Sequence, residues 1–128
     1  MLDHIGIPVT DFTAAKAFYG KALAPLGITM QMDLAPEITG DGHAAAGFGK
    51  ERPQFWIGES SKKGGTGHVA FTADSRAIVD EFYKAAIAAG GKDNGAPGLR
   101  PHYHENYYGA FVLDPDGHNI EAVCHKPE

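Results

Sequence analysis

The 128-residue chain has little of what several classes of protein require. It contains a single cysteine, Cys124, so no disulfide can form within it, and a reducing, cytoplasmic location is expected. No apolar run approaches the roughly 20 residues of a membrane-spanning helix, and no signal peptide is expected after Met1. The 11 basic residues are outnumbered by 16 acidic ones and form no cluster, so nucleic acid is not expected as a partner.

The rest of the composition is that of an ordinary globular protein. Hydrophobic residues make up 43% of the chain and charged residues 21%. A chain of this length can bury most of its apolar surface without a disulfide. The length suits one domain or two small fused modules.

The clearest pattern in the chain is a repeat of its first part in its second. Residues 4–27 align without a gap on residues 68–91, at an offset of 64, with six identities against roughly one or two expected by chance. The identical pairs are His4 and His68, Phe18 and Phe82, Tyr19 and Tyr83, Ala22 and Ala86, Ala24 and Ala88, and Gly27 and Gly91. The chain is therefore interpreted as a single domain of two modules, residues 1–61 and 62–128, each opening with a strand that carries a histidine.

The hydrophobic periodicity predicts the same kind of elements in both modules. The first module is predicted to contain a strand at 2–9, a helix at 12–23 capped by Thr10 or Asp11, and strands at 28–33, 43–48 and 54–58, with a loop at 36–42. The second is predicted to contain a strand at 67–73, a helix from Asp74 or Ser75 to Ala89, a loosely structured segment at 92–100, and strands at 106–113 and 118–124 around a tight turn at 114–117. The expected fold is α+β, with two βαβββ modules paired about a pseudo-twofold into a half-open eight-stranded barrel with the helices outside.

Glu121 is the first candidate for chemistry, because it lies in an apolar strand. Burying a carboxylate is costly unless it is paired, protonated or bound to a cation. In paired modules the equivalent residues His4 and His68 converge, and two imidazoles with one carboxylate form the facial triad that holds non-haem iron and similar divalent metals. The sequence therefore predicts a site for Fe, Mn, Ni or Zn at His4, His68 and Glu121. The alternative for each histidine alone is a hydrogen-bonded strand residue without metal.

The same motifs resemble the vicinal oxygen chelate superfamily, which includes glyoxalase I, the extradiol dioxygenases, and the fosfomycin- and bleomycin-resistance proteins. The resemblance rests on the opening strand with His4, on residues 67–71 and on the turn and strand of residues 114–121. In the family, residues of the first, fifth and eighth strands bind metal, and the matching positions here are His4, His68 and Glu121. The resemblance implies a homodimeric, metal-dependent lyase or dioxygenase acting on a small substrate with vicinal oxygens, in which Glu121 also moves a proton. It equally includes a metal-free binder of a drug or metabolite, as in the bleomycin-resistance branch.

One position departs from the layout of glyoxalase I, which takes a fourth ligand from its fourth strand. The strict repeat offset places Ile57 opposite Glu121, and a slip of one residue places Trp56 there. Neither side chain can bind a metal. The three-ligand set is closer to the pattern of the extradiol dioxygenases.

Segment 101–108 packs two histidines and three tyrosines just before a predicted strand. Such side chains suit proton transfer near neutral pH and hydrogen bonding to oxyanions. His104 and Tyr108 are the candidates for proton transfer. Tyr103, Phe55, Trp56 and Phe111 are the candidates for lining the substrate cavity. The alternatives are a surface loop with aromatic packing for the segment and core packing for the phenylalanines and Trp56.

His118 is expected to complete its turn and face solvent, and Cys124 to be a buried, inert thiol.

Overall fold

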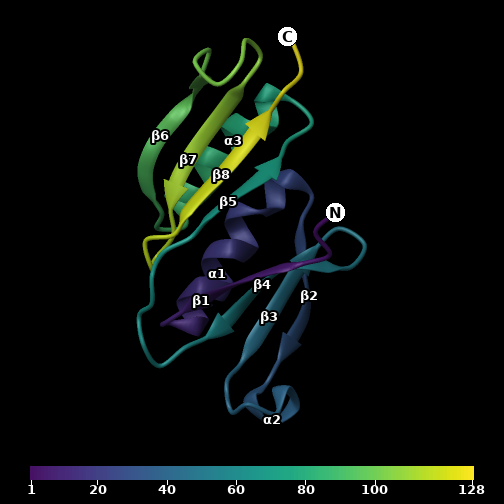
Figure 1. Ribbon diagram of the computed structural model, residues 1–128, viewed down its shortest axis with the longest axis vertical. Coiled ribbons are helices and arrows are strands. Elements are labelled where there is room, and N and C mark those ends of the chain that lie inside the picture. Colours follow the sequence, from purple (N-terminus) through teal and green to yellow (C-terminus); the bar gives the residue numbers. More distant parts are fainter.

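The computed structural model describes residues 1–128 as two four-stranded sheets with helices packed on them (Figure 1). Sheet A has the strand order β1-β4-β3-β2, and sheet B has the order β5-β8-β7-β6. The first module comprises β1 (Ile5–Val9), α1 (Phe12–Ala22), the 3₁₀ helix η1 (Ala24–Leu26), β2 (Thr29–Leu34), α2 (Pro36–Thr39), β3 (Ala45–Gly49) and β4 (Pro53–Glu59). The second comprises β5 (His68–Thr72), α3 (Arg76–Ala88), β6 (Lys92–Leu99), β7 (Tyr108–Leu113) and β8 (Asn119–Cys124). The predicted α+β fold of two similar modules is confirmed.

Local chemistry fixes where the two long helices begin. The Asp11 side chain accepts a hydrogen bond from the Ala14 N–H, and the Ser75 side chain accepts one from the Ile78 N–H. Each bond satisfies one of the free N–H groups of a helix N-terminus. Of the alternatives left open by the sequence, the structure therefore selects Asp11 for α1 and Ser75 for α3.

Two segments differ from the sequence prediction. Residues 92–99 form strand β6, where loose structure was expected, and the predicted loop at 36–42 contains the short helix α2. Strand β6 pairs with β7 through register shifts around Gly95 and Gly98. The glycines and Pro97 remove the alternating pattern by which a strand is normally recognised, and β6 tolerates them because it is an edge strand.

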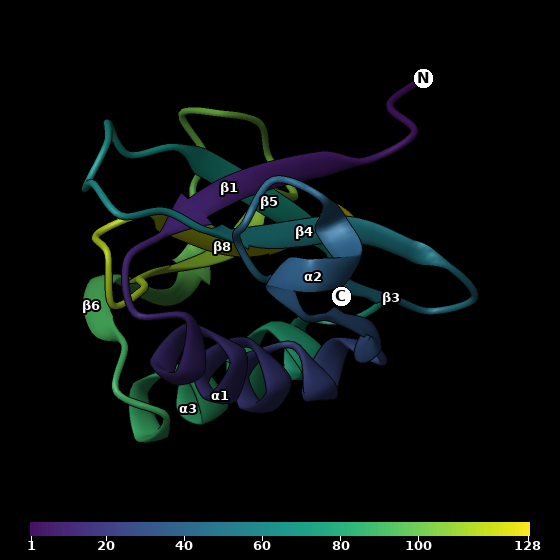
Figure 2. The same ribbon diagram turned by 90° about the horizontal axis from the view of Figure 1, so that it is seen from below.

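Both long helices lie on one side of the two sheets. Figure 2 shows α1 and α3 together beneath the sheets, and the two helices contact each other. One continuous hydrophobic core lies between these helices and both sheets. Neither long helix covers the opposite side, which we call the open face. The sheets are not closed on each other, so the barrel is half-open.

Strand register defines which side chains share the open face. In sheet A the row is Gly6, Trp56 and Gly47, and in sheet B the equivalent row is Ala70, Glu121 and Phe111. Side chains alternate between the two faces of a strand, so the neighbouring residues point toward the helices, and Phe55, Ile57, Ile120 and Ala122 lie in the core. No helix of the structure is long and apolar enough to cross a membrane.

A seam separates the two sheets where their edge strands β1 and β5 face each other (Figure 1). One end of the seam is held by hydrogen bonds from the turn after β7: Asp116 accepts from the Thr10 N–H and hydroxyl, at 3.1 and 2.7 Å. His118 Nδ1 accepts from the Gly67 N–H at 2.9 Å, and its Nε2 donates to the Pro8 carbonyl at 2.7 Å. We call this set the latch. The prediction that His118 faces solvent is wrong: it is 2% exposed, because it bridges two backbone groups that would otherwise lack partners.

Candidate functional site

The centre of the site is a buried carboxylate beside an exposed imidazole. Glu121, on β8, is 1% exposed, and His68, on β5, has a side chain that is 52% exposed. Their closest atoms, Glu121 Oε1 and His68 Nε2, are 2.8 Å apart. Parallel pairing of β5 with β8 sets Glu121 beside Ala70, two residues beyond His68, so both side chains lie on the open face. The structure therefore brings together two of the three predicted ligands.

Tyr107 holds the other oxygen of the carboxylate. Its hydroxyl donates to Glu121 Oε2. A Cβ at Gly109 would lie 3.2 Å from the Tyr107 ring and 3.4 Å from Glu121 Oε2, so a glycine there leaves room for both. Burial, followed by the hydrogen bond to Glu121, raises the pKa of Tyr107, so its phenol stays protonated at neutral pH and acts as a donor.

His4 does not join this pair within the chain. It precedes β1, its side chain is 61% exposed, and its Nδ1 lies 2.7 Å from Asp3 Oδ2. Asp3 is also 3.3 Å from Arg52. The hydrogen bond with His4 and the charge of Arg52 lower the pKa of Asp3. No group of three or more histidine, cysteine, aspartate or glutamate side chains is placed to hold a metal ion. The sequence expectation that His4 and His68 converge with Glu121 in one chain is therefore not met, because the sheets lie side by side.

The position equivalent to Glu121 in the first module is occupied by Trp56. Gly6 pairs with Trp56 as Ala70 pairs with Glu121, and Gly6 and Ala70 are 64 residues apart, as the repeat requires. Of the two alignments that the sequence left open, the structure selects the one-residue slip. Ile57 instead points into the core. Trp56 is half-buried on the open face and lies over Gly47, where a Cβ would come within 3.0 Å of the indole.

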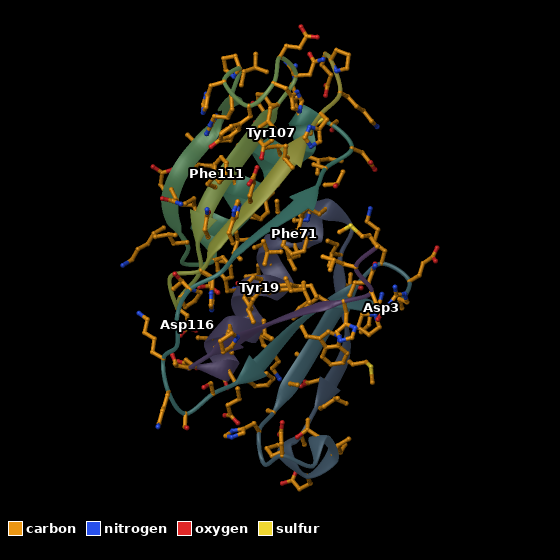
Figure 3. The ribbon with its side chains drawn as sticks, viewed as in Figure 1. Asp3, Tyr19, Phe71, Tyr107, Phe111 and Asp116 are labelled. Carbon is orange, nitrogen blue, oxygen red and sulfur yellow. The ribbon has the colours of Figure 1, made fainter.

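The histidine- and tyrosine-rich segment forms a stacked aromatic group at one end of sheet B. His104 Nε2 lies 2.6 Å from His125 Nδ1, and the two rings are stacked with centroids 4.8 Å apart. Tyr107 meets both rings edge-on, at 5.4 and 5.3 Å. Tyr103, which is exposed, packs against Tyr107 at 4.8 Å. His104 and Tyr103 are thus linked to Glu121 through Tyr107, which is labelled in Figure 3.

The remaining candidates divide between the two faces of the sheets. Phe111 is on the open face, 6.3 Å from the His68 ring and beneath the Arg100 guanidinium. Phe55 is 3% exposed and packs on the helix side of sheet A. Tyr108 is also on the helix side, where its hydroxyl donates to Asp80 of α3 at 2.7 Å. Neither Phe55 nor Tyr108 therefore faces Glu121.

The sequence did not identify Tyr107 as a site residue; its neighbour Tyr108 was the candidate instead. The signal that could have found it is strand parity: in β7, Phe111 pairs with Glu121, so residues at steps of two from Phe111 share its face. Gly109 and then Tyr107 follow from that count, whereas Tyr108 falls on the opposite face.

Comparison with known proteins agrees with this architecture. The family model of the Glyoxalase/Bleomycin resistance protein/Dioxygenase superfamily matches residues 1–122. A glyoxalase/bleomycin resistance protein from Albidiferax ferrireducens T118 is similar, with 26% identity over 98% of both chains and a TM-score of 0.74. A family member from Burkholderia phytofirmans PsJN has 21% identity over 98% of both chains and a TM-score of 0.71. A glyoxalase I mutant from Zea mays has 19% identity and a TM-score of 0.71, with 99% of this chain covering 45% of that one. No curated protein matches the chain. The match of the family model over nearly the whole length shows that the chain belongs to the Glyoxalase/Bleomycin resistance protein/Dioxygenase superfamily.

Proposed function

We propose that the protein is a metal-dependent lyase or dioxygenase acting on a small substrate with two adjacent oxygens. In this proposal His68 and Glu121 of one copy hold a divalent metal together with His4 of a second copy in a homodimer. The observation that carries the proposal is the buried carboxylate of Glu121, aimed at an exposed imidazole on a face that no helix covers.

The donor set supports a divalent metal. One carboxylate offsets the charge of the ion, and neutral imidazoles supply nitrogen ligands. The hydrogen bonds that hold these ligands in place also suit metal binding. Tyr107 holds the carboxylate oxygen that faces away from His68, and Asp3 holds Nδ1 of His4, which leaves Nε2 of His4 available. A carboxylate on the far nitrogen of a ligand histidine is the usual way of orienting the ring.

Pairing with a second copy follows from the placement of the three side chains. The open face of each module lacks a covering layer, and His4 is exposed beside the open face of sheet A. If the open face of sheet A meets the open face of sheet B from another copy, His4 approaches His68 and Glu121. Superfamily members often form dimers, and twofold pairing would create two identical sites.

A metal in this position would polarise two adjacent oxygens of a substrate as a Lewis acid. The residues of the chain divide the remaining tasks. Glu121 is held on both oxygens in a site closed to solvent on its inner side. Tyr107 stays protonated and donates. Phe111 and Trp56 provide apolar walls that exclude water, and His104, at the exposed rim, is placed to exchange protons with solvent.

A metal-free binding protein is the second candidate, and one observation favours it. Trp56 stands where a fourth ligand would be, so the open face of sheet A offers an aromatic surface and not a second carboxylate. Aromatic walls suit the capture of a flat drug or metabolite.

Elemental analysis separates the two candidates. The protein is purified without chelators and reconstituted separately with Fe, Mn, Ni and Zn. We expect about one ion per chain, and loss of that ion in His4→Ala, His68→Ala and Glu121→Gln. His43→Ala is the control, since His43 is exposed in the loop between α2 and β3 and is not one of the proposed ligands. Wild-type protein that stays free of metal under all four conditions would leave only the metal-free candidate.

A mixing experiment tests whether the ligands come from two copies. The variants His4→Ala and Glu121→Gln are unfolded, combined and refolded together, and metal content is measured. In a mixed dimer, the Glu121→Gln copy supplies its intact His4 to the intact His68 and Glu121 of the other copy, so one of the two sites is complete. Recovery of metal in the mixture, with none in either variant alone, is the expected result. If the three ligands belonged to one chain, mixing would recover nothing.

A further inference from the structure

The seam between the sheets opens into a cavity of about 400 Å³ at the end opposite the latch. Figure 3 marks the two ends, with Asp116 at the latch and Asp3 at the cavity. The cavity is bounded by the N-terminal segment before β1, by the β3–β4 hairpin and by the whole of β5. Its volume falls within the range of about 300–1,000 Å³ typical of small-molecule sites. His4 and His68 are among the residues that line it, whereas Glu121 and Tyr107 are not.

The floor of the cavity is apolar and partly aromatic. Val69 and Phe71 of β5 and Ile28 are half-buried there, so their side chains remain accessible from the cavity. Beneath them, Phe71 meets Phe55 edge-on at 5.2 Å, and Phe55 is fixed by Tyr19 at 5.0 Å. A floor fixed by the core in this way is preformed, which lowers the cost of ordering it around a ligand.

The rim of the cavity carries one uncompensated charge. The carboxylate of Asp3 is already engaged by His4 and Arg52. Lys50 takes part in none of the four ion pairs of the chain, and its ammonium is exposed at the end of β3. The cavity therefore combines an apolar interior with a positively charged edge.

We propose that this seam cavity binds small organic anions, in which an aromatic or branched apolar group lies on Val69 and Phe71 and a carboxylate or sulfonate faces Lys50. The cavity adjoins the proposed metal site, because His4 and His68 are among the residues that line it. The anion is held by Lys50 and the apolar floor, so its binding does not require the metal. It takes its apolar surface from both modules, so a ligand there stabilises their present side-by-side arrangement.

A matched pair of probes tests the proposal. Isotope-labelled protein in EDTA is titrated with 3-phenylpropionate and with 3-phenylpropylamine, which differ only in the sign of the charged group, and amide chemical shifts are followed. The propionate should produce saturable shifts at Ile28, Lys50 and Thr72, and the amine should bind at least about tenfold more weakly, because attraction to Lys50 becomes repulsion. An absence of saturable shifts at these residues, or equal binding of both probes, would overturn the proposal.

Three variants locate the binding energy. Lys50→Glu should weaken binding of the propionate at least about tenfold, whereas Lys84→Glu, which changes the net charge equally on the exposed side of α3, should change it less than about twofold. Thr72→Trp places a large side chain at an exposed position of the rim and should abolish binding of both probes. Equal effects of the two lysine variants, or unaltered binding by folded Thr72→Trp, would show that the anion binds elsewhere.

Discussion

The latch offers the sharpest test of how the two modules are joined. His118 bridges the Gly67 N–H, which can only donate, and the Pro8 carbonyl, which can only accept. The two partners therefore fix the neutral ring with its proton on Nε2. The substitution His118→Leu puts an apolar side chain of comparable size in its place and removes both hydrogen bonds.

The expected loss of stability follows from what the substitution leaves behind. The Gly67 N–H and the Pro8 carbonyl each lose a partner, at a cost of about 1–3 kcal/mol per buried group. Both are only partly buried, so some water reaches them, and the total should be about 2–4 kcal/mol. Natural domains of this size are stable by only about 5–15 kcal/mol, so the change should lower the Tm by roughly 8–16 °C.

Thermal unfolding followed by circular dichroism measures this loss, and amide hydrogen exchange locates it at Gly67. His43→Leu is the matched control: His43 is exposed, so its replacement should alter stability by no more than about 0.5 kcal/mol. If His118→Leu and His43→Leu melted within 2 °C of each other (a difference below about 1 kcal/mol), the two hydrogen bonds of His118 would contribute nothing to holding the modules together.

Four further substitutions have defined outcomes. Burial, then a nearby carboxylate, raises the pKa of Tyr19, so stability in urea should hold below about pH 10 and fall above it as the unfolded chain ionises. Tyr19→Phe should flatten that alkaline fall, and an unchanged slope would contradict the assignment. Tyr107→Phe should weaken metal affinity about 10–100-fold in competition with a chelator, because Glu121 loses its outer hydrogen bond; unaltered affinity would exclude this role. A Cβ at Gly91 would lie 2.4 Å from a valine methyl, so Gly91→Ala should cost about 1–3 kcal/mol. Gly20→Ala, in an open helix position, should add about 0.5–1 kcal/mol, and the same sign for both alanines in denaturant titrations would refute the packing argument.

The repeat pattern predicted the modules well because it lies in their helices and first strands. Phe18 and Phe82 are both buried in the core, as residues at equivalent positions of two similar modules should be. The prediction of Glu121 as a buried carboxylate also held, because a strand whose neighbouring residues are all apolar is buried on both faces, and the carboxylate is buried with them. Local patterns thus determined which side chains are buried.

The relative placement of the modules could not be predicted from the same patterns. Each module buries its helix on its own sheet whether the sheets face each other or lie side by side, so the periodicity is the same in both cases. The choice depends on a few contacts, such as Phe18 against Gly91, where no Cβ intervenes, and Asp116 with Thr10. The expectation of three converging ligands assumed facing modules; within one chain, His68 and Glu121 lie 2.8 Å apart and His4 is not beside them.

The two modules differ at the carboxylate position, and this difference makes a metal site with ligands from two copies of the chain reasonable. Both modules carry the histidine, as His4 and His68, but only the second carries the carboxylate, and the first has Trp56 in its place. A module paired with a copy of itself would therefore offer two carboxylates or none. Pairing a first module with a second module gives two imidazoles, one carboxylate and one aromatic wall. With the modules of one chain side by side, the facing partner must come from another chain, and twofold symmetry then yields two such sites per dimer. The proposal accordingly requires one metal ion per chain, although each ion contacts two chains. A single site on the twofold axis, shared by both copies, would instead give one ion per dimer.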